Sequence, residues 1–161
     1  MINTKTPVKL SGIRNITISG RIGTGKSTLA ANLSQYLGWD LLDGGKIFRK
    51  YADEYGFHIT EKEKIPDDFD RAFEEKTKQI LKKDKNYIVQ THLAGFLAQK
   101  IPQVYKILVV CKNDRGEDKQ SIRIDRLMNR ELISAKKAKQ EVNEREERLL
   151  KKFKKLYVQN D

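Results

Sequence analysis

The chain is poor in the residue types that mark several protein classes. Its one cysteine, Cys111, allows no intramolecular disulfide and no cysteine-clustered zinc site. A lone cysteine is typical of a reducing compartment, so we expect a cytoplasmic protein. The longest strongly apolar run, residues 107–111, is far shorter than the ~18 residues of a membrane-spanning helix. The first 15 residues have no apolar segment of the kind that a signal peptide contains.

Proline is scarce as well, and no linker divides the chain. Pro7, Pro66 and Pro102 all fall between predicted elements, and no repeat or low-complexity tract occurs in the 161 residues. One domain over residues 1–161 is the simplest interpretation, since a domain typically has about 150 residues. Hydrophobic residues make up 38% of the chain, which suffices for one core and argues against disorder.

Acidic residues are outnumbered, and this surplus of basic charge needs an explanation. The chain has 33 Lys and Arg against 22 Asp and Glu, a net charge of +11 at pH 7. Residues 1–50 and 101–161 each carry +6, whereas residues 51–100 carry −1. The last third mixes both signs at helical spacing, so it is not a basic tail. A surplus of this size indicates a polyanionic partner, with nucleic acid as the first candidate.

The pattern of apolar residues predicts strands that alternate with helices. We expect strands at 13–19, 40–43, 87–90 and 105–111. We expect helices at 28–37, 44–55, 67–83, 93–99 and 118–157, the last broken near Ile133 and capped again by Ser134. This alternation predicts an α/β protein with three α/β/α layers around a parallel sheet of four or five strands.

Residues 20–28 carry a phosphate-binding loop, or P-loop. Gly20, Gly25, Lys26 and Ser27 match G-x-x-x-x-G-K-[ST] between a predicted strand and a predicted helix. The glycines let the loop curl so that backbone N–H groups face a phosphate chain. Lys26 is expected to reach the β- and γ-phosphates, and the Ser27 hydroxyl to ligate Mg²⁺. The predicted nucleotide contacts are Gly20, Arg21, Ile22, Gly23, Thr24, Gly25, Lys26, Ser27 and Thr28.

The loop alone fits a kinase, an ATPase or a GTPase. The sequence has no Asn/Thr-Lys-x-Asp and no Asp-x-x-Gly after a hydrophobic strand, two features of GTPases. A chain of 161 residues is short for a mechanical ATPase. These observations favour a kinase that acts on a small acceptor.

Further segments appear in the order found in one kinase family. They are Gly45-Lys-Ile-Phe-Arg49-Lys-Tyr-Ala52, Leu93-Ala-Gly95, Arg123-x-x-Arg126-x-x-x-Arg130-Glu-x-Ile-Ser134, Arg145-Glu-Glu147 and Leu156-Tyr157. From about residue 15 onward, the chain resembles the cytidylate kinases. It is most similar to the short, archaeal-type branch of these nucleoside monophosphate kinases.

The resemblance implies a P-loop kinase fold with a helical lid, and transfer of the ATP γ-phosphate to CMP or dCMP with Mg²⁺. It implies an N-terminal extension at 1–14, an acceptor-binding helical region at 44–84, and lid and C-terminal helices at 118–157. Gly45, Arg49, Asp70 and His92 would then bind the acceptor. The catalytic residues would be Lys26 together with the lid arginines Arg126, Arg130 and Arg145.

Plainer interpretations of these residues stay open. Arg49 and Lys50 could be solvated charges, and Asp70 could be one of three acids at a helix start. The lid segment could simply form i,i+4 pairs, such as Glu141–Arg145 and Glu144–Arg148.

The chain departs from the family pattern in three places. The relatives have an acidic residue and then an arginine where this chain has Gln90 and His92. Gln90 brings no negative charge to organise Mg²⁺, and a largely neutral histidine lacks the two-pronged phosphate grip of a guanidinium. The relatives also continue past the lid with another strand and helix.

These departures leave three alternatives open: reduced activity, another acceptor, or a nucleotide-binding protein with little kinase activity. A shikimate-like kinase is the second choice among enzymes, although Asp40-Leu-Leu-Asp43 lacks the Asp-x-Asp spacing of that family. The expected partner is a nucleoside monophosphate and not a membrane. The lysines between 136 and 155 leave weak nucleic-acid binding open, and the sequence is compatible with a monomer or an oligomer.

Overall fold

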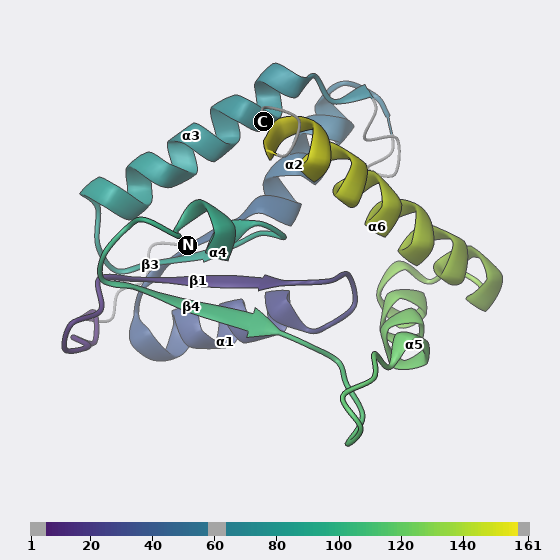
Figure 1. Cartoon of the computed structure of the whole chain (residues 1–161), viewed down its shortest axis with the longest axis horizontal. Coiled ribbons are helices and arrows are strands. Elements are labelled where there is room, and N and C mark those ends of the chain that lie inside the picture. The colour runs from purple at the N-terminus through teal and green to yellow at the C-terminus, as the bar shows by residue number, and fades with distance from the viewer. Residues whose placement is uncertain (1–5, 58–63, 158–161) are drawn as a thin grey trace. The chain divides into compact units, whose positions relative to one another are not determined.

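A computed structural model describes residues 6–57 and 64–157 of the chain (Figure 1). Its internal contacts define two compact units. The first unit is Met1–Gly20 with Gly25–Val109, and the second unit is Arg21–Thr24 with Val110–Asp161. The P-loop sequence is therefore shared, because its central residues belong to the second unit and its two ends to the first. The assignment of residues 1–161 to one domain stays a prediction.

The first unit is built on a parallel β-sheet. Its strands, in the order β2-β3-β1-β4 across the sheet, are all parallel to their neighbours. Their bounds are β1 (Asn15–Gly20), β2 (Asp40–Asp43), β3 (Tyr87–Gln90) and β4 (Val104–Val109). In the described residues the sheet thus has four strands, the lower of the two numbers expected from the sequence.

Helices cover both faces of this sheet, as Figure 1 shows for the first unit. They are α1 (Lys26–Leu37), α2 (Gly44–Glu54), α3 (Asp67–Lys83) and α4 (Ala94–Leu97). On one face, α1 packs through Ala30 and Leu37 on a cluster that contains Ile18 and Ile88. On the other, α3 and α4 pack on a cluster that contains Val89. The three-layer α/β/α prediction is confirmed.

The strand sequences explain why both faces are covered. Neighbouring residues of a strand point to opposite faces, and the neighbours Ile88 and Val89 of β3 are each fully buried in a different cluster. A strand buried on both sides needs a continuous apolar run in place of alternation. Residues 87–89 form such a run, and the strand predicted at 87–90 agrees with the bounds of β3.

Helices α5 (Gln120–Glu131) and α6 (Ala135–Tyr157) form most of the second unit. Leu132 ends α5 in the left-handed conformation, and the Ser134 hydroxyl accepts a hydrogen bond from the Lys137 N–H at 3.3 Å. The predicted break near Ile133 and its serine cap are confirmed. Across the described ranges, 6–57 and 64–157, no helix has the length and apolarity needed to cross a membrane.

Several predicted boundaries differ from the structure by one or two residues, and pairing with another segment explains two of them. The strand expected at 105–111 ends at Val109, because its partner β1 ends at Gly20, which pairs with Val109. The helix expected from residue 118 begins at Gln120, because Asp118 instead forms a β-bridge with Lys112. The strand therefore ends where a partner distant in the sequence ends, and the helix start is displaced by a bridge between two nearby residues.

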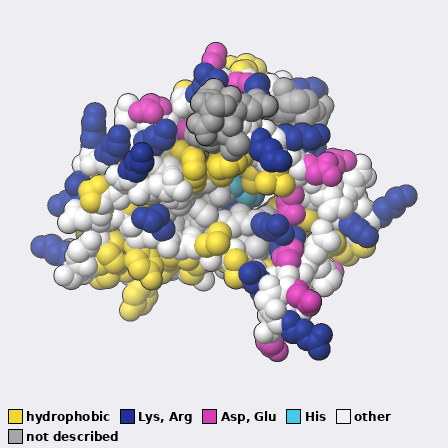
Figure 2. Space-filling model, in the orientation of Figure 1, with side chains coloured by type: hydrophobic (Ala, Val, Ile, Leu, Met, Phe, Trp, Pro, Cys, Tyr) yellow, Lys and Arg dark blue, Asp and Glu magenta, His cyan; other side chains and the backbone are white. Residues whose placement is uncertain are grey.

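Basic side chains do not gather in one place on the face shown in Figure 2. Lys and Arg are spread over this face, with Asp and Glu between them. This distribution differs from the continuous basic stripe that is typical of a nucleic-acid-binding surface.

Candidate functional site

The first unit supplies both ends of the P-loop. Gly20 ends β1, and Gly25, with φ of 95°, caps α1 without a side-chain hydrogen bond. Lys26 and Ser27 open the helix, and Lys26 is 8% exposed in spite of its charge. The first N–H groups of a helix need partners from outside the helix, and its N-terminus favours an anion. This end of α1 is therefore suited to a phosphate group.

Oxygen atoms lie beside Ser27 at the edge where the strands end. The Ser27 hydroxyl donates a hydrogen bond to Oε1 of Gln90 at 3.4 Å, and Gln90 pairs in register with Asp43 of β2. Hydroxyl, amide and carboxylate oxygens are the ligands that Mg²⁺ prefers. No cluster of three His, Cys, Asp or Glu that could hold a metal occurs in the described part of the chain. This set fits an ion that keeps several waters and takes the rest of its ligands from substrate phosphates.

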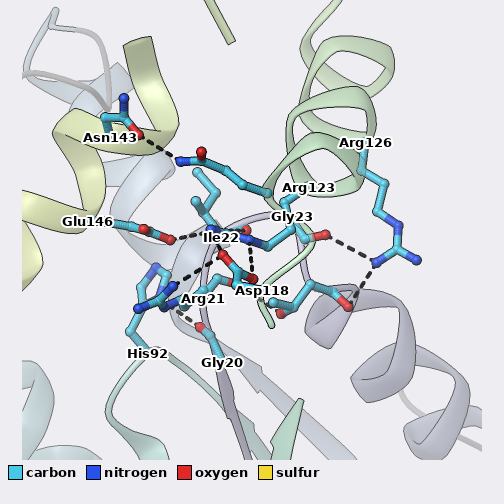
Figure 3. A network of polar contacts seen from close by, with 12 residues as sticks. Gly20, Arg21, Ile22, Gly23, His92, Asp118, Arg123, Arg126, Asn143 and Glu146 are labelled. Carbon is cyan, nitrogen blue, oxygen red and sulfur yellow. Dashed lines mark hydrogen bonds and ion pairs between the residues drawn. The ribbon is translucent and has the colours of Figure 1, made fainter. Parts of the chain in front are cut away.

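His92, the residue found in place of the family's arginine, lies at the same end of the sheet. Its Nδ1 is 3.0 Å from the carbonyl oxygen of Gly20, a contact drawn in Figure 3. A carbonyl oxygen can only accept, so this contact requires the proton to be on Nδ1. In the neutral ring Nε2 is then an acceptor, whereas in the charged ring both nitrogens donate.

Arg49 folds back over the first turn of α2. Its Nη1 and Nη2 atoms are both 3.5 Å from the position that a Cβ on Gly45 would occupy. Asp43 caps this helix by accepting a hydrogen bond from the Lys46 N–H at 3.1 Å. The neighbouring Lys50 instead pairs with Glu54 on the surface at 3.7 Å. A guanidinium beside a helix N-terminus forms a local positive field of the kind that holds phosphate.

Asp70 lies in the first turn of α3 together with Asp67 and Asp68. This is where acids stabilise a helix, so the plainer interpretation of Asp70 has structural support. Aromatic rings pack α2 against α3 beside it: Phe48 meets Phe69 and Phe73 at ring-centroid distances of 5.3 and 5.1 Å.

The second unit holds the central residues of the P-loop, 21–24, which we call the loop tip. Gly23 has φ of 75°, and a Cβ there would lie 2.5 Å from the carbonyl oxygen of Arg123 in α5. Only glycine lets the tip approach the helix so closely. Arg126 of α5 donates from Nη1 to the carbonyls of Gly23 at 3.2 Å and Thr24 at 3.1 Å (Figure 3).

Arg123 is the most buried charge among the described residues of the second unit, with 0% exposure. It donates to both carboxylate oxygens of Asp118, at 3.1 and 2.6 Å, and to Glu146 of α6. It also donates to the carbonyl of Ile22 in the loop tip at 3.1 Å. Burial alone would lower the pKa of Arg123, but its hydrogen bonds to Asp118 and Glu146 outweigh this and raise it. Arg123 therefore stays charged.

Arg130 and Arg145, two of the arginines predicted to belong to a lid, pair with nearby acids in α5 and α6. Arg130 contacts Glu131 at 2.9 Å, and Arg145 contacts Glu141 at 2.6 Å. Arg148 contacts Glu144 at 3.0 Å, so both i,i+4 pairs suggested by the sequence are present. The sequence interpretation gave Arg123 no role of its own. Its spacing of four residues from the buried Leu127 on the same helix face was the available signal.

The parallel sheet, its helices on both faces and the glycine-rich loop after β1 define a P-loop kinase fold. A gluconokinase from Sinorhizobium meliloti 1021 has a similar fold, with a TM-score of 0.51 over 81% of this chain and 74% of that one. Its sequence is 12% identical, so this likeness concerns the fold alone.

Sequence comparisons identify the family. Residues 15–160 match the model of the cytidylate kinase-like family. A cytidylate kinase from Natronomonas pharaonis is 32% identical over 133 residues, which cover 81% of this chain and 65% of that protein. One from Saccharolobus islandicus is 30% identical over 145 residues, which cover 88% and 72%. The chain therefore belongs to the cytidylate kinase-like family, and it spans about 65% of the length of the Natronomonas protein.

Proposed function

We propose that this protein is a nucleoside monophosphate kinase that transfers the γ-phosphate of ATP to CMP or dCMP. The observation that carries the proposal is the P-loop at the end of β1, with the buried Lys26 at the start of α1, in a chain of the cytidylate kinase-like family. The names of the related cytidylate kinases support the choice of acceptor.

The proposed reaction needs little covalent chemistry from the protein. An oxygen of the acceptor phosphate attacks the γ-phosphorus, the new P–O bond forms, and the bond between that phosphorus and the β–γ bridging oxygen breaks to release ADP. The acceptor phosphate is already an anion, so no side chain has to act as a base. The protein must instead position the two nucleotides and neutralise the charge that spreads over the transferred group.

The side chains have separate roles in this proposal. The P-loop and Lys26 bind the donor phosphates, and Arg49 binds the acceptor phosphate over the first turn of α2. Ser27, whose hydroxyl lies 3.4 Å from Oε1 of Gln90, would hold Mg²⁺, which neutralises phosphate charge when bound. Arg126, Arg130 and Arg145 are proposed to contact the transferring group. Asp70 and His92 are proposed to face the acceptor.

A panel of acceptors tests the proposal. ADP formation is measured by a coupled assay with ATP, Mg²⁺ and either CMP, dCMP, UMP, AMP, shikimate or gluconate. We expect turnover that depends on CMP or dCMP and is at least tenfold slower with the other acceptors. If turnover occurs only with another acceptor, that acceptor takes the place of CMP in the proposal. If no acceptor supports turnover, the proposed kinase activity is disproved.

Gln90 and His92 favour one second candidate, a nucleotide-binding protein with little kinase activity. Gln90 accepts a hydrogen bond from the Ser27 hydroxyl but carries no negative charge. The contact from Nδ1 of His92 to Gly20 leaves the neutral ring with only an acceptor at Nε2. ATP binding measured by calorimetry, together with no turnover in the panel, would support this candidate over the kinase.

A further inference from the structure

The loop tip is held by its carbonyl groups. The Thr24 hydroxyl donates to the carbonyl of Arg21 at 2.9 Å, and Arg123 donates to that of Ile22. Arg126 donates to the carbonyls of the next two residues, Gly23 and Thr24. Four consecutive carbonyl oxygens of the tip therefore accept hydrogen bonds, three of them from guanidinium groups of α5.

This pattern also determines where the N–H groups point. A trans peptide is planar, so the carbonyl of one residue and the N–H of the next point in opposite directions. The carbonyls of residues 22–24 face the guanidinium groups, and they therefore direct the N–H groups of residues 23–25 away from those groups. A run of N–H groups on one side of a curled loop is the arrangement that binds phosphate.

We propose that Arg123 is a positioning residue for ATP, which holds the Ile22 peptide so that the Gly23 N–H faces the polyphosphate. The proposal rests on the proposed function and adds a residue to it. Arg123 contacts no phosphate in this proposal, because it is fully buried among Asp118, Glu146 and Ile22. Without the hydrogen bond from Arg123, the Ile22 peptide can rotate and point its carbonyl oxygen at the polyphosphate, which weakens ATP binding.

The buried network gives Arg123 a fixed orientation, as Figure 3 shows. Asp118 accepts from Nε and Nη2, and Glu146 and Ile22 both accept from Nη1. Asp118 also accepts from Arg21 of the tip at 3.2 Å. A lysine has one ammonium group in place of the planar guanidinium. It therefore cannot donate hydrogen bonds to both carboxylate oxygens of Asp118 and to the Ile22 carbonyl at the same time.

The experiment measures ATP binding without an acceptor, by isothermal titration calorimetry, for Arg123→Lys and for Arg148→Lys. The second variant is the matched control, because Arg148 also pairs with an acid of α6, namely Glu144 one turn away on the same helix. We expect Arg123→Lys to raise the Kd of ATP about tenfold, the loss of about one charge-assisted hydrogen bond. Arg148→Lys should change it less than twofold.

Steady-state kinetics and NMR add readouts that a merely structural role would not move. Arg123→Lys should raise the KM for ATP and leave the KM for the acceptor within twofold. It should also shift the backbone amide signals of Gly23 and Gly25 in the nucleotide-free protein. A lower Tm with unchanged ATP affinity and unchanged amide signals would overturn the proposal.

Glu146→Gln provides a second variant if Arg123→Lys does not fold. It removes one charge beside Arg123 and leaves the loop residues intact, so we expect a threefold to fivefold rise in the Kd of ATP; an unchanged Kd would count against the positioning role. If the unaltered protein binds ATP but transfers phosphate to no acceptor, the proposed kinase function is wrong while the positioning role of Arg123 can still be tested. If the unaltered protein does not bind ATP, both proposals are wrong.

Discussion

The two parts of the P-loop are held by different forces. Its ends, Gly20 and Gly25–Lys26, continue a strand and a helix of the first unit that pack through an apolar cluster. The loop tip, residues 21–24, is held in the second unit by guanidinium groups on its carbonyls, with Ile22 alone in an apolar cluster. Apolar packing sets the position of a segment, whereas hydrogen bonds are directional and set which way each peptide faces. The contacts of the tip therefore fix the orientation of its peptide groups.

The largest expected effect comes from a residue at the apolar-packed end of the loop. We expect Lys26→Met to lower kcat about 10²–10³-fold, the typical cost of losing one preorganised group that stabilises developing charge. Steady-state kinetics with ATP and CMP measures it. Lys82→Met, at an exposed position of α3, is the control and should leave kcat unchanged. If kcat of Lys26→Met falls less than fivefold, Lys26 does not have the proposed catalytic role.

The next effect tests the ion network of the second unit. We expect Arg123→Met to lower the free energy of unfolding by about 2–3 kcal/mol. This is less than for a fully buried network, because Asp118 and Glu146 keep contact with water. Urea unfolding at pH 7 measures it.

The same variant gives a prediction for pH. The raised pKa of Arg123 means that its stabilisation is complete below the unfolded-state pKa and is lost only as the pH rises through the folded-state pKa. Both values lie in the strongly alkaline range. The stability difference between the wild type and Arg123→Met should thus be constant from pH 7 to 10. If this difference declines between pH 7 and 10, Arg123 is not charged throughout this range in both the folded and the unfolded state.

A smaller effect is expected at the helix start beside the sheet. Arg49→Lys should raise the KM for the acceptor about tenfold, because an ammonium cannot make the paired hydrogen bonds of a guanidinium to phosphate. The KM for ATP should stay within twofold, as measured by varying each substrate in turn. Lys50→Gln, which alters only a surface charge paired with Glu54, serves as the control. Equal rises in both KM values would show that Arg49 supports the fold and not the acceptor.

The smallest effect is a gain. His92→Arg should lower the KM for the acceptor about threefold to fivefold, since a guanidinium donates to phosphate at any pH whereas the Nε2 of the neutral histidine only accepts. The same kinetic assay measures it, with His92→Gln as the uncharged comparison. An unchanged KM in both variants would indicate that His92 serves the Gly20 contact alone.

Much of the fold could be read from local patterns. The strand at 87–90 and the helix at 67–83 have the predicted bounds, because a buried apolar run and a helical repeat bounded by Pro66 are local signals. The ends of β4 and α5 were missed, because a pairing with Gly20 and a bridge from Lys112 set them. The first of these contacts joins residues about 90 positions apart, so the sequence near β4 carries no trace of it.

Local sequence patterns were enough to predict a glycine-rich loop with Lys26 and Ser27 after a buried strand, because the spacing of these residue types is a local requirement of phosphate binding. The sequence also fixes the net charge of +11. How that charge is used depends on the folded structure. Arg123 lies buried against Ile22, which is 101 residues away, whereas Arg145 and Arg148 pair with acids of their own helix. Whether a guanidinium meets a carbonyl, a carboxylate or water depends on which elements fold beside it, and composition carries no information about that.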